Sequence, residues 1–86
     1  MYVSSESDER LWWYDGERVE FRTANYPLLL RLMLSEPVLT LEEMQKRLGV
    51  NMSAVKKLVA QLLNKHYIER GIAEGSWRVF LTPSVY

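Results

Sequence analysis

The sequence predicts an α+β fold in which two β-hairpins flank three helices. Asp15-Gly16 stands between two β-prone runs, and Thr40 and Asn51 each precede a helical pattern of apolar residues. Near the end of the chain, a glycine-flanked segment separates two further β-prone runs. The chain has 86 residues and no cysteine. That length suits one small domain, and the composition excludes disulfides and thiolate metal sites.

Residues 10–21 are expected to form the first hairpin, because Asp15-Gly16 suits a type I′ turn, in which both central residues need positive φ. A two-residue turn fixes the cross-strand pairs, which are Tyr14 with Glu17, Trp13 with Arg18, Trp12 with Val19, and Leu11 with Glu20. Side chains alternate along a strand. The expected core face therefore consists of Trp12, Tyr14, Val19 and Phe21.

The segment 26–35 is predicted to be a helix, with Thr23 or Asn25 as its cap and Pro27 in its first turn. Only Arg31 interrupts its apolar residues, so we expect neighbours to cover it on several sides. A second copy of the chain is one candidate for that cover.

The stretch from Thr40 to Ile68 predicts two helices joined by a tight turn. Thr40 opens a capping box with Glu43, Gly49 suits a left-handed helix end, and Asn51 suits the cap of the next helix, 52–65. The core-facing residues of that helix are expected to be Val55, Leu58, Val59 and Leu62. A neighbouring face carries Ser53, Lys56, Lys57 and Ala60, and it is free to meet a charged ligand.

The last part of the chain predicts a second hairpin. Residues 67–70 and 76–82 resemble strands, and Pro83 is expected to stop the second of them. Val38-Leu39 is expected to add a very short strand. Trp77 is expected to cover the core from its strand.

The net charge of zero hides an uneven distribution. Residues 1–44 carry four Arg and nine Asp or Glu, giving −5, whereas residues 45–86 carry seven Lys or Arg and two Glu, giving +5. The basic half contains the helix 52–65 and the second hairpin. A basic face of this kind can bind phosphates even on a neutral protein. Ordinary charge scatter is the alternative interpretation.

The residue types exclude several functions. A single histidine, no cysteine and no glycine-rich phosphate loop leave no nucleophile–base pair and no metal cluster, so we expect no enzymatic activity, cofactor or metal. The longest apolar run, 27–30, is too short to cross a membrane, and the acidic start differs from a signal peptide. We therefore expect a cytoplasmic protein, with a flexible arm at 1–9 and one domain at 10–86.

Part of the chain resembles the helix-turn-helix core of winged-helix regulators. The residues that carry the resemblance are Leu48-Gly49-Val50-Asn51, Ala54-Val55, Leu58-Val59, Leu62 and Lys65-His66-Tyr67-Ile68. Asn51 stands where the family has a serine-like cap, and His66 stands where glycine is usual. Over residues 26–82 the resemblance implies a winged helix-turn-helix, with a three-helix core, a C-terminal β-wing and an extra N-terminal β-hairpin. Compact bacterial, phage and plasmid transcriptional regulators are similar, and the N-terminal hairpin loosely resembles OmpR/PhoB-class effector domains.

The resemblance implies binding to double-stranded DNA, with the helix 52–65 in the major groove and the wing 67–82 on the backbone. Carried over to this chain, the groove contacts are Asn51, Ser53, Lys56 and Lys57, the flanking backbone contacts are Lys46 and Arg47, and the wing contacts are Arg70 and Arg78. We expect a transcriptional regulator that forms a homodimer through the N-terminal hairpin or the helix 26–35.

Two alternatives stay open. The lysines of helix 52–65 also fit a solvated surface, and the wing arginines also fit ion pairs with Glu69 and Glu74. The fold itself also serves as a protein-interaction module. In that case the chain would be an assembly adaptor that uses the apolar helix and the tryptophan-rich hairpin without binding DNA.

Overall fold

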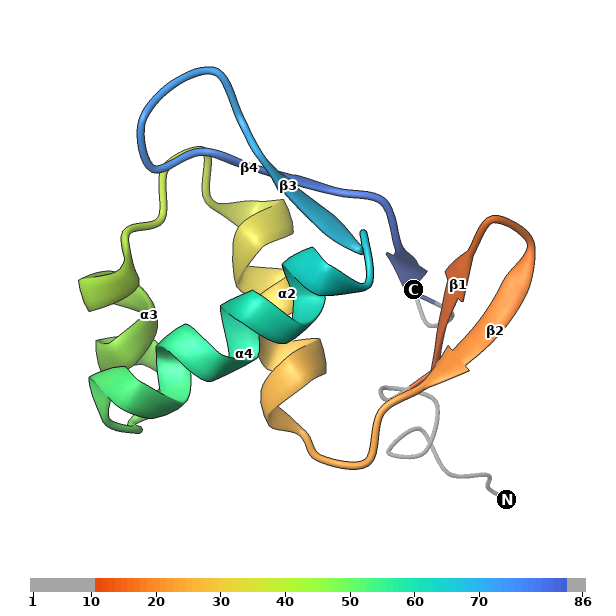
Figure 1. The fold of residues 1–86 in the computed structure, drawn as a ribbon, viewed down its shortest axis with the longest axis horizontal. Helices are drawn as coiled ribbons and strands as arrows, with labels where there is room; N and C mark the ends of the chain where they lie inside the picture. Colours follow the sequence, from red (N-terminus) through yellow and green to blue (C-terminus); the bar gives the residue numbers. More distant parts are fainter. Residues whose placement is uncertain (1–10, 84–86) are drawn as a thin grey trace.

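The computed structural model describes residues 11–83, which form an α+β fold (Figure 1). Within that range there are three helices and two small antiparallel sheets. The elements in chain order are β1 (Leu11–Tyr14), β2 (Glu17–Glu20), α2 (Asn25–Ser35), α3 (Leu41–Leu48), α4 (Met52–Asn64), β3 (Ile68–Arg70), β4 (Trp77–Val79) and β5 (Thr82–Pro83). The arm expected at 1–9 lies outside the described residues.

The β1–β2 hairpin has the predicted turn and register. Asp15 and Gly16 have φ values of 53° and 82°, and the pairing runs from Tyr14 with Glu17 to Leu11 with Glu20. On the predicted core face Trp12 and Phe21 are buried, while Tyr14 and Val19 are partly buried and packed against the core. Trp13 lies on the opposite face, across from Arg18. The two central residues of the turn and the alternation of side chains therefore fixed this element locally.

The prediction of one strand over 76–82, stopped by Pro83, was wrong. The chain leaves strand geometry at Phe80 and Leu81, and β5 then pairs antiparallel with β1, placing Pro83 opposite Trp12. Buried Leu81 anchors this bend in the core, and the resulting sheet has the order β2-β1-β5. Proline is tolerated because β5 is an edge strand, whose outer side needs no N–H donor.

Helix α2 begins without the predicted cap. Ala24 occupies the cap position in helical geometry, with φ −74° and ψ −13° and no side-chain hydrogen bond, while Asn25 is already helical. Thr23 and Asn25 were therefore wrong as caps, since a capping side chain works from an extended residue. The helix buries Pro27, Leu29, Leu30 and Met33. The expectation of cover on several sides holds only in part, because Leu28 and Leu34 are each 50% exposed.

The α3–α4 pair has the predicted caps. The Thr40 hydroxyl accepts a hydrogen bond from the Glu43 amide at 3.2 Å, Gly49 has φ 71°, and the Asn51 side chain accepts from the Ala54 amide at 2.8 Å. Helix α4 ends at Asn64, one residue before the predicted end. Its four predicted core residues, Val55, Leu58, Val59 and Leu62, are all buried.

After α4 the chain reverses through a left-handed residue. His66 has φ 63°, its amide donates to the Leu63 carbonyl, and the Tyr67 amide donates to the Leu62 carbonyl, both at 3.0 Å. This pair of bonds is the Schellman arrangement that satisfies the last carbonyls of a helix, and its left-handed position usually holds glycine. The turn directs the chain into β3.

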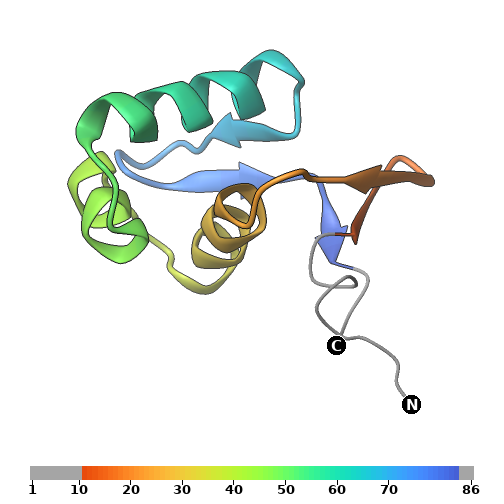
Figure 2. The same cartoon turned by 90° about the horizontal axis from the view of Figure 1, so that it is seen from below.

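The β3–β4 hairpin is attached to the loop between α2 and α3. The Leu39 amide donates to the Gly75 carbonyl at 2.7 Å, and the Trp77 indole Nε1 donates to the Leu39 carbonyl at 2.8 Å. Val38-Leu39 does not form the short strand that was expected, although both backbone groups of Leu39 are bonded. Trp77 is half-buried against the core, as predicted. Figure 2 shows α4 on one side of this hairpin and α2 on the other, with β1 and β2 projecting beyond the helices.

Candidate nucleic-acid interface

The outward face of α4 carries small and basic side chains. Ser53, Lys56, Lys57 and Ala60 are all exposed, as predicted, on the side of the helix opposite its buried residues. Among residues 11–83, no carboxylate forms an ion pair with Lys56 or Lys57. Asn51 stands at the start of this face, where its side-chain oxygen caps the helix and its amide nitrogen stays available as a donor. We call Asn51, Ser53, Lys56, Lys57 and Ala60 the α4 face.

Two cavities border the α4 face and show which groups lie next to it. One, of about 260 Å³, is lined by Leu41, Lys56, Val59, Ala60, Leu63 and Arg70. It brings Lys56 of α4 beside Arg70 of β3. The other, of about 350 Å³, is lined by Lys57, Ala60, Gln61 and Asn64. The sequence interpretation missed Asn64, although its spacing from Lys57 and Gln61 could have found it.

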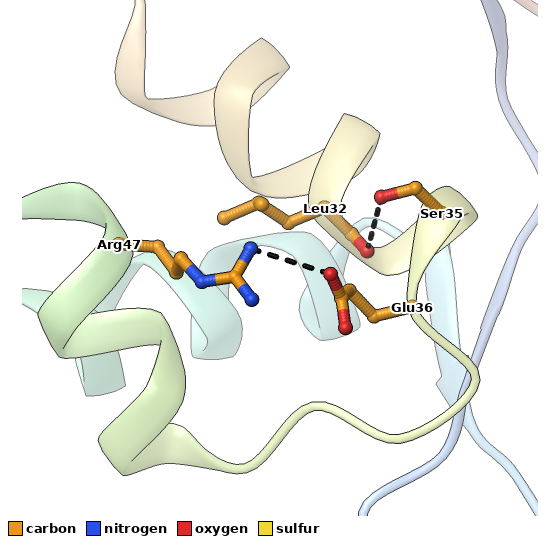
Figure 3. A network of polar contacts seen from close by, with 4 residues as sticks. All are labelled: Leu32, Ser35, Glu36 and Arg47. Carbon is orange, nitrogen blue, oxygen red and sulfur yellow. Dashed lines mark hydrogen bonds and ion pairs between the residues drawn. The ribbon is translucent and has the colours of Figure 1, made fainter.

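Arg47 and Lys46 lie in the last turn of α3, and both are exposed. Arg47 is not a free cation, because its Nη1 lies 3.3 Å from Oε2 of Glu36 at the end of α2. Figure 3 shows this ion pair crossing between the two helices, beside the hydrogen bond from the Ser35 hydroxyl to the Leu32 carbonyl. The pair reduces the positive charge that Arg47 offers to a ligand. Sequence reasoning missed it, because the partners belong to different elements.

The two hairpin arginines differ in their surroundings. Arg78 Nη1 lies 3.5 Å from Oε1 of Glu69, so the ion pair considered as an alternative is present. The Arg70 guanidinium has no ion pair among residues 11–83 and lies 5.3 Å from the centre of the Trp77 ring, much as Arg78 lies 5.6 Å from that of Phe80. Such stacking holds the arginine in place and leaves its charge uncancelled. Arg70 is therefore the stronger candidate for binding an anion.

Two kinds of feature, a metal-binding cluster and a membrane-spanning helix, are absent from the described part of the chain. Between residues 11 and 83, no three His, Cys, Asp or Glu side chains gather as a metal site would require. No helix in the same range combines the length and apolar character needed to cross a membrane. Comparisons with protein-family models, curated proteins and solved structures give no match for this chain. What it binds is therefore inferred from its own residues.

Proposed function

We propose that this chain is a winged helix-turn-helix that binds duplex DNA as a transcriptional regulator. Helix α4 enters the major groove, and the β3–β4 hairpin lies against the sugar–phosphate backbone. The observation that carries the proposal is the α4 face, where two lysines without a carboxylate partner in the described range stand among small side chains. Small side chains let a helix approach the base edges closely, and lysine binds phosphates or guanine.

The arrangement of α3 and α4 supports this proposal. Both helices begin with a side-chain cap, and the turn between them contains left-handed Gly49 and partly buried Val50. A short, capped and packed turn fixes the direction of α4 relative to α3, which a groove-reading helix requires. The cavity shared by Lys56 and Arg70 extends the basic surface from the helix to the hairpin.

The ion pairs rank the eight candidate residues. Lys46, Lys56, Lys57 and Arg70 have no carboxylate partner among residues 11–83. Of these, Lys56, Lys57 and Arg70 lie on or beside the α4 face, so they should contribute most to binding. Arg47 and Arg78 each face a carboxylate, and a phosphate would have to compete with it. Lys46, Asn51 and Ser53 are exposed and complete the contact set.

The proposal is tested by measuring affinity for a random-sequence duplex at several salt concentrations, using fluorescence anisotropy. The slope of log K against log salt should be about −0.9 per phosphate neutralised. Replacing both Lys56 and Lys57 by Ala should weaken binding and make the slope shallower by about two. Arg22→Ala is the control, because Arg22 is exposed and lies between β2 and α2, outside the α4 face and the β3–β4 hairpin. Equal affinity of the double variant and the parent would exclude the groove-helix assignment.

A second candidate function is a protein-interaction adaptor. Its support is the number of large apolar side chains that the described fold leaves exposed, which are Trp13, Leu28, Leu34, Val38, Ile72 and Phe80. Exposed apolar side chains mark a protein interface where they form a contiguous patch. If the chain is an adaptor, it should not retard duplex DNA in gel electrophoresis at low salt. The DNA-binding proposal requires that retardation. Selection of binding sites from random duplexes would then identify the target sequence.

A further inference from the structure

Within the described part of the chain, the outer edge of β2 carries backbone groups that no strand pairs with. The sheet order is β2-β1-β5, so within residues 11–83 β2 has one strand neighbour (Figure 1). Tyr14 and Glu17 flank the two-residue turn and form a hydrogen-bonded pair, and antiparallel pairing alternates from there. Val19 therefore directs its backbone groups toward β1, while Arg18 and Glu20 direct theirs away from the sheet. Outward N–H and C=O groups of this kind are a template for another strand.

We propose that β2 pairs antiparallel with β2 of a second copy of this chain, about a two-fold axis at Val19. This self-association surface goes beyond the proposed DNA binding and does not depend on it. The two-fold axis that relates two antiparallel copies of one strand runs perpendicular to the sheet, so one residue pairs with its own copy. For a strand spanning Glu17–Glu20 and followed by Phe21, the central candidates are Arg18, Val19 and Glu20.

The charges of β2 select among these three registers. An axis at Arg18 places two arginines opposite each other, and an axis at Glu20 places two glutamates opposite each other. An axis at Val19 instead places Arg18 opposite Glu20 of the second copy, on both sides of the axis. Opposite charges stabilise a cross-strand pair and like charges destabilise it. Arg18 and Glu20 are exposed on one face of the hairpin, so their side chains are free to make this pair.

The same register uses the outward backbone groups. Arg18 of one copy and Glu20 of the second copy become a hydrogen-bonded pair, in which each residue donates its N–H to the carbonyl of the other. The two-fold axis generates the same pair a second time. Val19 meets its own copy as a non-hydrogen-bonded pair, in which side chains pack closely. Val19 is partly buried against the core, so its contact with the second Val19 would continue an apolar surface. Backbone and side chains thus agree on one register.

A cavity beside β2 gives a second observation in favour of the axis at Val19. It has a volume of about 190 Å³ and is lined by Val19, Glu20, Phe21, Tyr26, Gln61, Leu62, Lys65 and Tyr67. None of these residues belongs to β1; they come from β2 and Phe21, from α2, from α4 and Lys65, and from Tyr67 before β3. With the axis at Val19, Glu17 of the second copy stands opposite Phe21, toward the cavity rim that carries Lys65. Glu17 and Lys65 are both exposed, and neither has an ion pair among residues 11–83.

Helix α2 is the other surface that the sequence suggests for a dimer, and it fits less well. Its exposed leucines, Leu28 and Leu34, are six residues apart and so point in different directions around the helix. Arg31, between them, has its guanidinium 5.5 Å from the centre of the Trp12 ring. These residues do not make one apolar stripe that a second helix could cover.

Sedimentation equilibrium of the full chain and of charge variants tests the proposal. Arg18→Glu and Glu20→Arg each place like charges opposite one another, and each should raise the dimer Kd by on the order of tenfold. The double exchange, with both substitutions in one chain, restores opposite charges and should return Kd toward the parent value. Glu74→Arg is the matched control, because it makes the same charge change on the exposed β3–β4 loop and should leave Kd unchanged.

Amide hydrogen exchange gives a second measurement, whose expected result a change in folding stability alone would not produce. The Arg18 and Glu20 amides should become more protected as protein concentration rises, while the Val19 amide, bonded to β1, should be protected at every concentration. A parent chain that stays monomeric at millimolar concentration would overturn the proposal. A double exchange that fails to restore Kd would also overturn it. A dimer that is unaffected by the charge variants but dissociates in a Leu28→Glu variant would overturn it too, because that result would assign the contact to α2.

Discussion

Replacing His66 by glycine is expected to stabilise the protein. His66 has φ 63° in the turn that follows α4, where its amide bonds to the Leu63 carbonyl at 3.0 Å. A side chain in left-handed geometry costs roughly 1–2 kcal/mol, because its Cβ crowds the following carbonyl oxygen. Glycine removes that cost but gives the unfolded chain more freedom, which costs roughly 0.5–1 kcal/mol. The net gain in the free energy of unfolding should be about 0.5–1 kcal/mol.

Thermal unfolding followed by circular dichroism measures this gain. In a domain of this size, 1 kcal/mol shifts the midpoint by roughly 4–8 °C, so His66→Gly should raise it by about 2–8 °C. Urea unfolding should give the same free-energy difference with an unchanged m-value. His66→Ala is the control, because it removes the imidazole and keeps the Cβ in the left-handed position. The reasoning fails if His66→Gly is no more stable than His66→Ala.

Two further substitutions test bonds that hold the functional elements in place. Asn51→Ala removes the side chain that accepts from the Ala54 amide at 2.8 Å, and it should lower the free energy of unfolding by about 1 kcal/mol in urea denaturation, while Asn51→Ser should retain most of it. Equal loss in both variants would argue against a capping role. Trp77→Phe removes the indole donor to the Leu39 carbonyl and should cost roughly 1–3 kcal/mol, with faster hydrogen exchange at the Leu39 amide. Parent-like stability and exchange would mean that this bond contributes little.

The elements that were predicted correctly are those whose structure depends on a short stretch of sequence. Asp15-Gly16 fixed both the turn and the register of β1 and β2, because a two-residue turn allows one pairing. Thr40 and Asn51 were found because a helix cap acts within three residues. The spacing of apolar residues on α4 predicted its buried side, and the exposed lysines followed from the same periodicity.

Contacts between distant segments escaped prediction for a physical reason. The Arg47–Glu36 ion pair and the Trp77–Leu39 hydrogen bond depend on how separate elements pack together. No local sequence pattern predicts that packing. Pro83 illustrates the opposite error: its lack of an N–H suggested a strand end, but an edge strand accepts it. Ala24 gave no signal at all, since the start of α2 lacks a side-chain cap.

The pairing of β1 with β5 has a consequence for the order of folding. Trp12 and Pro83 lie near opposite ends of the sequence, so this contact raises the contact order and requires closure of nearly the whole chain. The α3–α4 pair, by contrast, depends on neighbouring residues and can form early. A two-stranded hairpin is marginal in isolation. During synthesis the three-stranded sheet would therefore be completed only when residues 82–83 arrive.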